Sequence, residues 1–179
     1  MSREKVCIGT CCCCTCFSKD SILTVKENDK IIKKYIPEIK IDDLVLTLIN
    51  GEKKFIKVNF YQAYDEEFNF YEFQCEANNK IKTIKVTDYH IMIVYDKDIK
   101  EVKYKIAKDI KVGDYFNTID GLFQVKEIKT YNMKYKYALG VDEGSVIVND
   151  ILVSCFNFDD YNKNLSINQL FQKYHINIL

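Results

Sequence analysis

Two segments of this chain, residues 36–47 and 106–118, carry closely similar sequences. Each segment begins with an isoleucine-rich stretch that is followed by an aspartate. A short segment typical of a β-strand comes next, and then a turn. An internal repeat of this kind predicts a fold of two structurally related halves. The alternative is a chance similarity between two segments that both lead into a strand. An offset of 71 residues relates Ile39 to Ile110, Asp43 to Asp114, and Thr47 to Thr118.

Most of the chain beyond the first residues consists of short apolar or alternating segments separated by polar turns. Segments of about four to eight residues that are rich in Val, Ile, Tyr, Phe and Thr are typical of β-strands. Asn50-Gly51 and Asp120-Gly121 indicate tight hairpin turns, because glycine readily adopts the positive φ that such turns need. We therefore predict an all-β fold with strands at residues 21–26, 43–49, 54–60, 68–75, 80–86, 91–95, 115–118, 123–128, 135–141 and 145–148.

Helical periodicity is confined to the last part of the chain. Between Ser166 and Tyr174, two further apolar side chains, Leu170 and Phe171, can share a helical face with Tyr174. We expect a short helical or coil tail there, packed on the sheet.

Length, charge and hydropathy exclude several classes of function. A chain of 179 residues has the size of a single domain. Lys and Arg together number 26, as do Asp and Glu, so no basic excess can displace counterions from nucleic acid, and we expect no nucleic-acid partner. No apolar run approaches the roughly 18 residues of a transmembrane helix, and no signal peptide is visible. If the N-terminus is native, we expect a monomer in the cytoplasm or at a membrane.

The cysteines are concentrated near the N-terminus, and only Cys75 and Cys155 lie elsewhere. Adjacent cysteines rarely bridge one another, and two distant partners cannot serve six thiols, so we expect no disulfide framework. The two histidines, His90 and His175, are isolated, and the paired spacing of a zinc site is missing. We therefore expect no metal and no cofactor. The clustered cysteines are Cys7, Cys11, Cys12, Cys13, Cys14 and Cys16.

Three short motifs follow one another along the chain: Cys16-Phe17, Thr87-x-x-His90, and Val148-Asn149-Asp150 leading into Ser154-Cys155-Phe156. In this order and spacing they resemble the Hint family, and within it the C-terminal autoprocessing domain of Hedgehog proteins more than the inteins. The resemblance covers residues 16–156 and implies a horseshoe-like, all-β fold of two pseudo-twofold-related halves. It leaves a cysteine-rich segment at residues 1–15 and a short amphipathic tail at residues 157–179.

The resemblance implies self-cleavage that begins with an N-to-S acyl shift. Cys16 is implied as the nucleophile that attacks the carbonyl of Thr15 and converts the peptide bond to a thioester. His90 is implied to protonate the leaving nitrogen, since an imidazole can deliver a proton near neutral pH. Thr87 is implied to hold the scissile amide out of plane. Cys155 matches the family's second cysteine, which either assists the thioester or only packs in an apolar strand.

A second step must release the acyl group. Asp65 is implied as the general base for an incoming sterol hydroxyl; a solvated turn carboxylate is the alternative, because Glu66 and Glu67 stand beside it. The family's sterol-recognition region follows the last motif, where this chain has only residues 157–179. Water, a thiol, or a lipid or sterol hydroxyl therefore stays open as the acyl acceptor. Thr15 replaces the glycine of Hedgehog proteins, which predicts a slower first step.

Two other functions are alternatives to self-cleavage. Intein-type splicing is not expected, because His175 and Asn177 are not adjacent and no nucleophilic residue follows the asparagine. The alternative of a different class is that the β domain is an inert scaffold. Its cysteine-rich segment, residues 1–15, would then be S-acylated at residues 11–14 and anchor the chain to a membrane. In that case Cys16 is one more acylation site and His90 is structural. The tail at residues 157–179 is a second candidate for membrane association.

Overall fold

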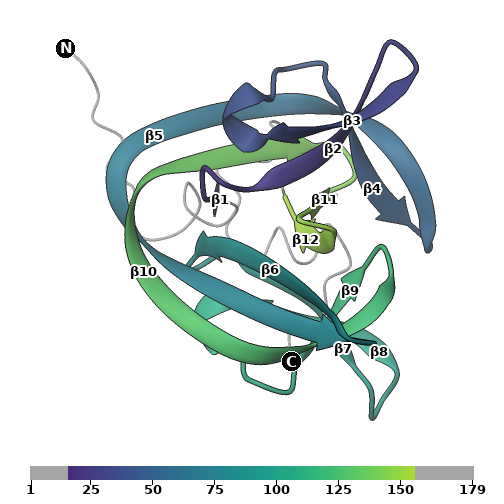
Figure 1. The fold of residues 1–179 in the computed structure, drawn as a ribbon, viewed down its shortest axis with the longest axis vertical. Helices are drawn as coiled ribbons and strands as arrows, with labels where there is room; N and C mark the ends of the chain where they lie inside the picture. Colours follow the sequence, from purple (N-terminus) through teal and green to yellow (C-terminus); the bar gives the residue numbers. More distant parts are fainter. Residues whose placement is uncertain (1–15, 156–179) are drawn as a thin grey trace.

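The computed structural model of the chain describes residues 16–155. These residues form one curved, twelve-stranded sheet with two short 3-10 helices, and the sheet has the predicted all-β architecture (Figure 1). The elements are β1 (Cys16–Phe17), β2 (Ile22–Glu27), β3 (Lys30–Tyr35), η1 (Ile36–Glu38), β4 (Leu44–Ile49), β5 (Glu52–Ala77), β6 (Lys80–Thr87), β7 (Ile91–Asp96), β8 (Glu101–Ile106), η2 (Ala107–Asp109), β9 (Tyr115–Thr118), β10 (Gly121–Val141), β11 (Ser145–Val148) and β12 (Ile151–Ser154).

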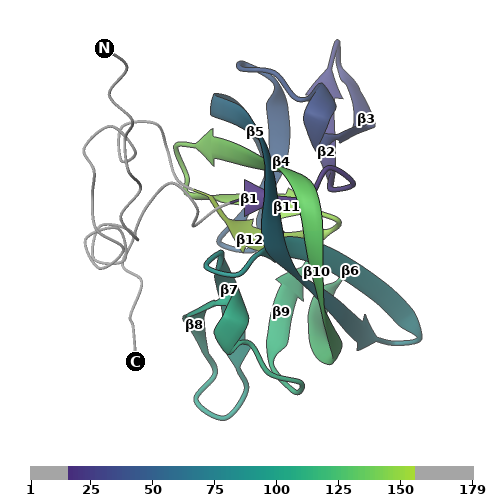
Figure 2. The same ribbon diagram turned by 90° about the vertical axis from the view of Figure 1, so that its left-hand side faces the viewer.

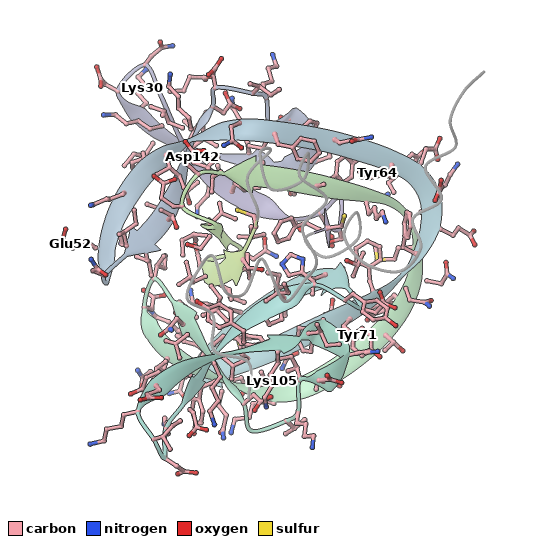
Figure 3. The ribbon with its side chains drawn as sticks, turned by 180° about the vertical axis from the view of Figure 1, so that it is seen from behind. Lys30, Glu52, Tyr64, Tyr71, Lys105 and Asp142 are labelled. Carbon is pink, nitrogen blue, oxygen red and sulfur yellow. The ribbon has the colours of Figure 1, made fainter. Side chains whose placement is uncertain are left out.

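Two long antiparallel strands, β5 and β10, pair with each other and form the curved central part of the sheet. They pair from Gln124 opposite Glu76 to Val141 opposite Val58, and both bend sharply on the way (Figure 1). The strands β2, β3 and β4 lie at one end of this pair and β7, β8 and β9 at the other, with β1, β11 and β12 between them (Figures 1 and 2). Tyr64 and Tyr71, both on β5, lie on either side of the bend (Figure 3).

The sequence repeat is a structural repeat. The order β2-β3-η1-β4-β5 in the first half recurs as β7-β8-η2-β9-β10 in the second. Backbone hydrogen bonds recur with it: Asp43 N donates to Lys40 O at 3.1 Å, and Asp114 N donates to Lys111 O at 3.1 Å. The equivalent aspartates each bind a lysine of the preceding strand, in the pairs Lys34–Asp43 and Lys105–Asp114. The prediction of two related halves is therefore confirmed.

The apolar side chains that predicted strands also build the core. Phe17, Phe73 and Phe116 are fully buried, and the rings of Phe73 and Phe116 meet edge to face with centroids 5.6 Å apart. Phe73 comes from β5 and Phe116 from β9, so this contact packs elements of different halves of the sequence together. The described part of the chain contains no helix with the length and apolar character of a membrane span.

Several predicted strands differ from the observed ones. Residues 54–60 and 68–75 belong to one strand, β5, and residues 123–128 and 135–141 belong to one strand, β10. The polar residues between the predicted segments stay extended because each long strand pairs with the other through the bend. The edge strands β3 and β8 and the short strands β1 and β12 were not predicted. The predicted tail at residues 157–179 lies outside the described residues.

The predicted hairpin turns are confirmed. Asn50 and Gly51 have φ values of 52° and 80° between β4 and β5, the left-handed conformations of a tight two-residue turn. Gly121 has φ of 103° at the start of β10, after the turn from β9.

Candidate active site

The first described residues form a very short strand in the middle of the sheet. In β1, Cys16 lies opposite Ala138 and Phe17 opposite Tyr137 of β10, while the other edge pairs Phe17 with Val86 of β6. Cys16 and Phe17 are both fully buried. The sheet thus holds the candidate nucleophile between β10 and β6.

The Thr87-x-x-His90 motif forms a tight turn at the end of β6. His90 N donates to the carbonyl oxygen of Thr87 at 3.0 Å, and both side chains are buried. The second half of the fold fastens this turn, because Ala107 N donates to His90 O at 2.7 Å and Lys108 N donates to Asp88 O at 2.9 Å. The 3-10 helix η2 therefore fixes the backbone that carries the imidazole.

The His90 ring lies between β1, which carries Cys16, and β12, which ends at Ser154. Its Nδ1 is 3.3 Å from the carbonyl oxygen of Cys16, and its Nε2 is 3.1 Å from the carbonyl oxygen of Ser154. The Phe17 ring meets it edge-on with centroids 4.8 Å apart. Three contacts from two distant segments thus fix the orientation of one imidazole.

These neighbours determine the protonation state of His90. A carbonyl oxygen only accepts hydrogen bonds, and a neutral imidazole has one N–H, so the two carbonyls are both satisfied only by the protonated ring. Complete burial opposes that charge and lowers the pKa of His90 to about 4, although the bonds to the Cys16 and Ser154 carbonyls act in the other direction. At neutral pH the ring is therefore mainly neutral and can accept a proton.

This buried histidine predicts a loss of stability in mild acid. The pKa of His90 in the folded chain lies below its ordinary value of 6.5, so the unfolded chain binds more protons between pH 6.5 and 4. The free energy of unfolding then falls as the pH drops through that window, by about 2 kcal/mol between pH 7 and 4.5. Denaturant titrations at the two pH values, in a Cys16→Ala background, measure the change.

Two variants separate the contribution of His90 to this pH dependence from that of the carboxylates, which also titrate in acid. His90→Gln should remove about 2 kcal/mol of the pH dependence, whereas His175→Gln should keep it. An unchanged pH dependence in His90→Gln would show that the ring is not held in its neutral form.

The third motif runs through the hairpin of β11 and β12, with Val148 at the end of β11 and Ser154 at the end of β12. Ser154 Oγ donates to the carbonyl oxygen of Ile91 at 2.5 Å, and Cys155 N donates to Gly144 O at 2.9 Å. Cys155 is fully buried, and burial raises the pKa of its thiol well above the usual range. The structure therefore places a protonated, enclosed thiol directly after the residue whose carbonyl contacts His90.

Asp65 lies apart from these buried groups. Its side chain is exposed on β5, and Oδ1 is 3.0 Å from Nζ of Lys134. The register of β5 and β10 shifts at this point, between Lys134 and Lys136, as expected for a β-bulge. The structure thus brings Cys16, Thr87, His90 and the Ser154-Cys155 segment together, and it places Asp65 at the surface of the bend.

The structure also shows a counterpart of the histidine turn that the motif analysis missed. Ser21 N donates to Ser18 O at 3.0 Å, just as His90 N donates to Thr87 O, and Ile36 N donates to Ser21 O at 2.8 Å. Ser18-x-x-Ser21 is therefore the equivalent of the histidine turn in the first half. In the sequence, this equivalence is visible only as a constant offset of 69 residues, which relates Ser18 to Thr87 and Ser21 to His90.

Within residues 16–155, no group of three or more His, Cys, Asp or Glu side chains is arranged to hold a metal ion.

The comparison with family models agrees with this geometry. The model of the Hint module matches residues 9–175 of the chain. The chain belongs to the Hint family. Hint domains and inteins are autocatalytic, self-processing domains, and the fold of this chain is the one on which self-splicing and autoprocessing take place.

Solved structures share the Hint fold with this chain at low sequence identity. An intein from a hyperthermophile superimposes with a TM-score of 0.67 at 15% identity, covering 77% of this chain and 98% of the intein. A DnaB intein from Synechocystis sp. PCC 6803 gives 0.62 at 15% identity, covering 78% and 97%. A bacterial intein-like domain from Clostridium thermocellum gives 0.59 at 19% identity, covering 78% and 98%. No curated protein sequence matches significantly.

Proposed function

We propose that this chain is a self-cleaving Hint domain that breaks the peptide bond between Thr15 and Cys16 through a thioester. The observation that carries the proposal is the position of His90, whose two ring nitrogens face the backbone of Cys16 and of Ser154. A buried imidazole against the backbone of a buried cysteine is suited to move a proton between the thiol and the amide that it attacks.

In the first step the Cys16 sulfur attacks the carbonyl carbon of Thr15. The C–S bond forms as the C–N bond breaks, and the thiol proton ends on the amide nitrogen of Cys16. His90 carries this proton: it is neutral at pH 7, so it accepts the thiol proton and then delivers it to the leaving nitrogen. Thr87 steadies the scissile amide from the same turn.

In the second step an acceptor takes the acyl group from the sulfur. Water, a thiol, or a lipid or sterol hydroxyl adds to the thioester carbonyl, the C–S bond breaks, and the acceptor's proton returns to the Cys16 sulfur. Cys155 follows β12, the strand that contacts His90. We assign it no attacking role, because burial keeps its thiol protonated and its hydrogen bond is with the Val141 backbone. Incubation of the purified chain with dithiothreitol, followed by intact-mass measurement, tests the proposal, because a thiol releases a thioester but not an amide.

Asp65 is assigned to the second step only, as a base for an acceptor hydroxyl. We expect Asp65→Ala to leave thiol-induced cleavage unchanged and to slow cleavage by a soluble alcohol such as glycerol by roughly 100-fold, because a weakly acidic alcohol needs a base and a thiol does not. Mass spectrometry of both reactions over time provides the two rates.

Glu66→Gln is the matched control, because it removes the neighbouring exposed carboxylate on β5. It should leave both rates unchanged. Equal slowing of thiol-induced and alcohol-induced cleavage in Asp65→Ala would rule out the assigned role and would favour a purely structural ion pair with Lys134.

A further inference from the structure

A cluster of charged side chains ties the turn after β1 to β6. Lys85 Nζ lies 2.6 Å from Oδ2 of Asp20 and 3.5 Å from Oε2 of Glu72. The Ser18 hydroxyl donates to the other oxygen of Asp20, and Ser18 N donates to Lys85 O at 3.4 Å. Tyr131 closes the cluster by donating from its hydroxyl to Glu72 at 3.4 Å.

This cluster lies where the two halves of the fold meet. The offset of 69 residues that relates Ser21 to His90 also relates Cys16 to Lys85. The two strands pair with each other between Phe17 and Val86, next to these two positions. Lys85 is therefore the counterpart of the nucleophile in the other half, and its ion pair with Asp20 spans the pseudo-twofold contact.

Asp20 and Lys85 both stay charged at neutral pH. Burial by itself lowers the pKa of Lys85, but the bonds to Asp20 and Glu72 outweigh it and raise the pKa above the ordinary value. Burial raises the pKa of Asp20, and its bonds to Lys85 and Ser18 outweigh that and lower it. The side chain of Lys85 is 23% exposed and that of Asp20 is 48% exposed, so the Lys85 end of this ion pair is the one shielded from solvent.

We propose that Asp20 and Lys85 are positioning residues for self-processing: their ion pair fixes β1, and with it Cys16, against the end of β6, where Thr87 begins the turn to His90. This inference rests on the proposed function. Only one residue of β1 pairs with β6, so few backbone hydrogen bonds define that distance. A displacement of about 1 Å between reacting groups can cost roughly 100-fold in rate.

The first test compares cleavage rates with a matched ion pair elsewhere. Lys85→Met and Asp20→Asn should each slow dithiothreitol-induced cleavage by roughly tenfold, measured well below the unfolding temperature of each variant. Lys103→Met is the control, because Lys103 pairs with Asp96 at 2.5 Å and both side chains are about as buried as Lys85. It should cleave at the wild-type rate.

Rescue separates positioning from a general loss of stability. Lys85→Arg keeps the charge and should retain most of the rate, and the exchange of Asp20→Lys with Lys85→Asp should cleave faster than either Lys85→Met or Asp20→Asn. Equal slowing in Lys85→Met and Lys103→Met, or no slowing in Lys85→Met and Asp20→Asn, would overturn the inference.

A second measurement does not depend on cleavage. Iodoacetamide should alkylate Cys16 faster in Lys85→Met than in the wild type or Lys103→Met, with the site located by fragment-ion mass spectrometry. The equally buried Cys75 serves as an internal reference for unfolding and should stay protected in all three. If the wild-type chain does not cleave at all, the proposed function fails, and alkylation alone then decides whether the ion pair holds Cys16 in place.

Discussion

We expect Cys16→Ala to abolish self-cleavage completely. The proposed reaction has one nucleophile for the carbonyl of Thr15, and alanine offers no atom that can form the thioester. Intact-mass spectra of the wild type and the variant, incubated with and without dithiothreitol, measure the effect. Cleavage that persists in Cys16→Ala would assign the reaction to another group or to a contaminating protease.

Two kinds of cysteine control make this result specific. Cys75→Ala removes a thiol that is as buried as Cys16, donates to Lys82 O at 3.4 Å and has a pKa raised to about 12 by burial, so it should cleave normally. Alanine at Cys11 through Cys14 should also have little effect, because those residues precede the attacked carbonyl in the sequence. Loss of cleavage in Cys75→Ala would indicate that any core cysteine replacement damages the fold.

The second large effect concerns His90. We expect His90→Gln to slow thiol-induced cleavage by roughly 100-fold or more, because an amide can reach the same carbonyls but cannot accept and release a proton near neutral pH. Initial rates at pH 7 from mass spectrometry measure the loss. His175→Gln, the other histidine of the chain, should cleave like the wild type.

The rate should also follow the titration of this imidazole. Since the pKa of His90 is lowered to about 4, cleavage should fall steeply below that pH, where the ring can no longer take the thiol proton. A rate that instead rises steadily through pH 4 would show that the ring acts only as a preformed acid. A normal rate in His90→Gln would leave the histidine a structural role.

The repeat made the fold predictable, and pairing between distant strands made parts of it unpredictable. Ile39, Asp43 and Thr47 recur at a constant offset, and the structure repeats β2 to β5 as β7 to β10. The single strand β5 was predicted as two, because Asp65 and its acidic neighbours are typical of a turn when considered locally. Their extended conformation depends on β10, whose pairing with β5 no local pattern contains.

The candidate site also has a part that the sequence predicted and a part that it could not predict. The residue types Cys16, Thr87, His90 and Cys155 were predicted from motif order, and the structure brings their segments together through β1 and β12. The burial of His90, which lowers its pKa, and the ion pair between Asp20 and Lys85 depend on tertiary contacts. Neither could be predicted from spacing along the chain.

The thioester itself is the central claim, and hydroxylamine at neutral pH tests it most directly. It attacks thioesters rapidly and ordinary amides very slowly, and it leaves a hydroxamate on the acyl carbon that it captures. Incubation of the full-length wild type should release residues 1–15 with a hydroxamate on Thr15, together with a fragment that begins at Cys16. Cleavage at Asn50-Gly51, a known weak point toward hydroxylamine, is distinguished by mass. An intact wild-type chain whose circular dichroism shows a folded β protein, or the same release from Cys16→Ala, would contradict the account.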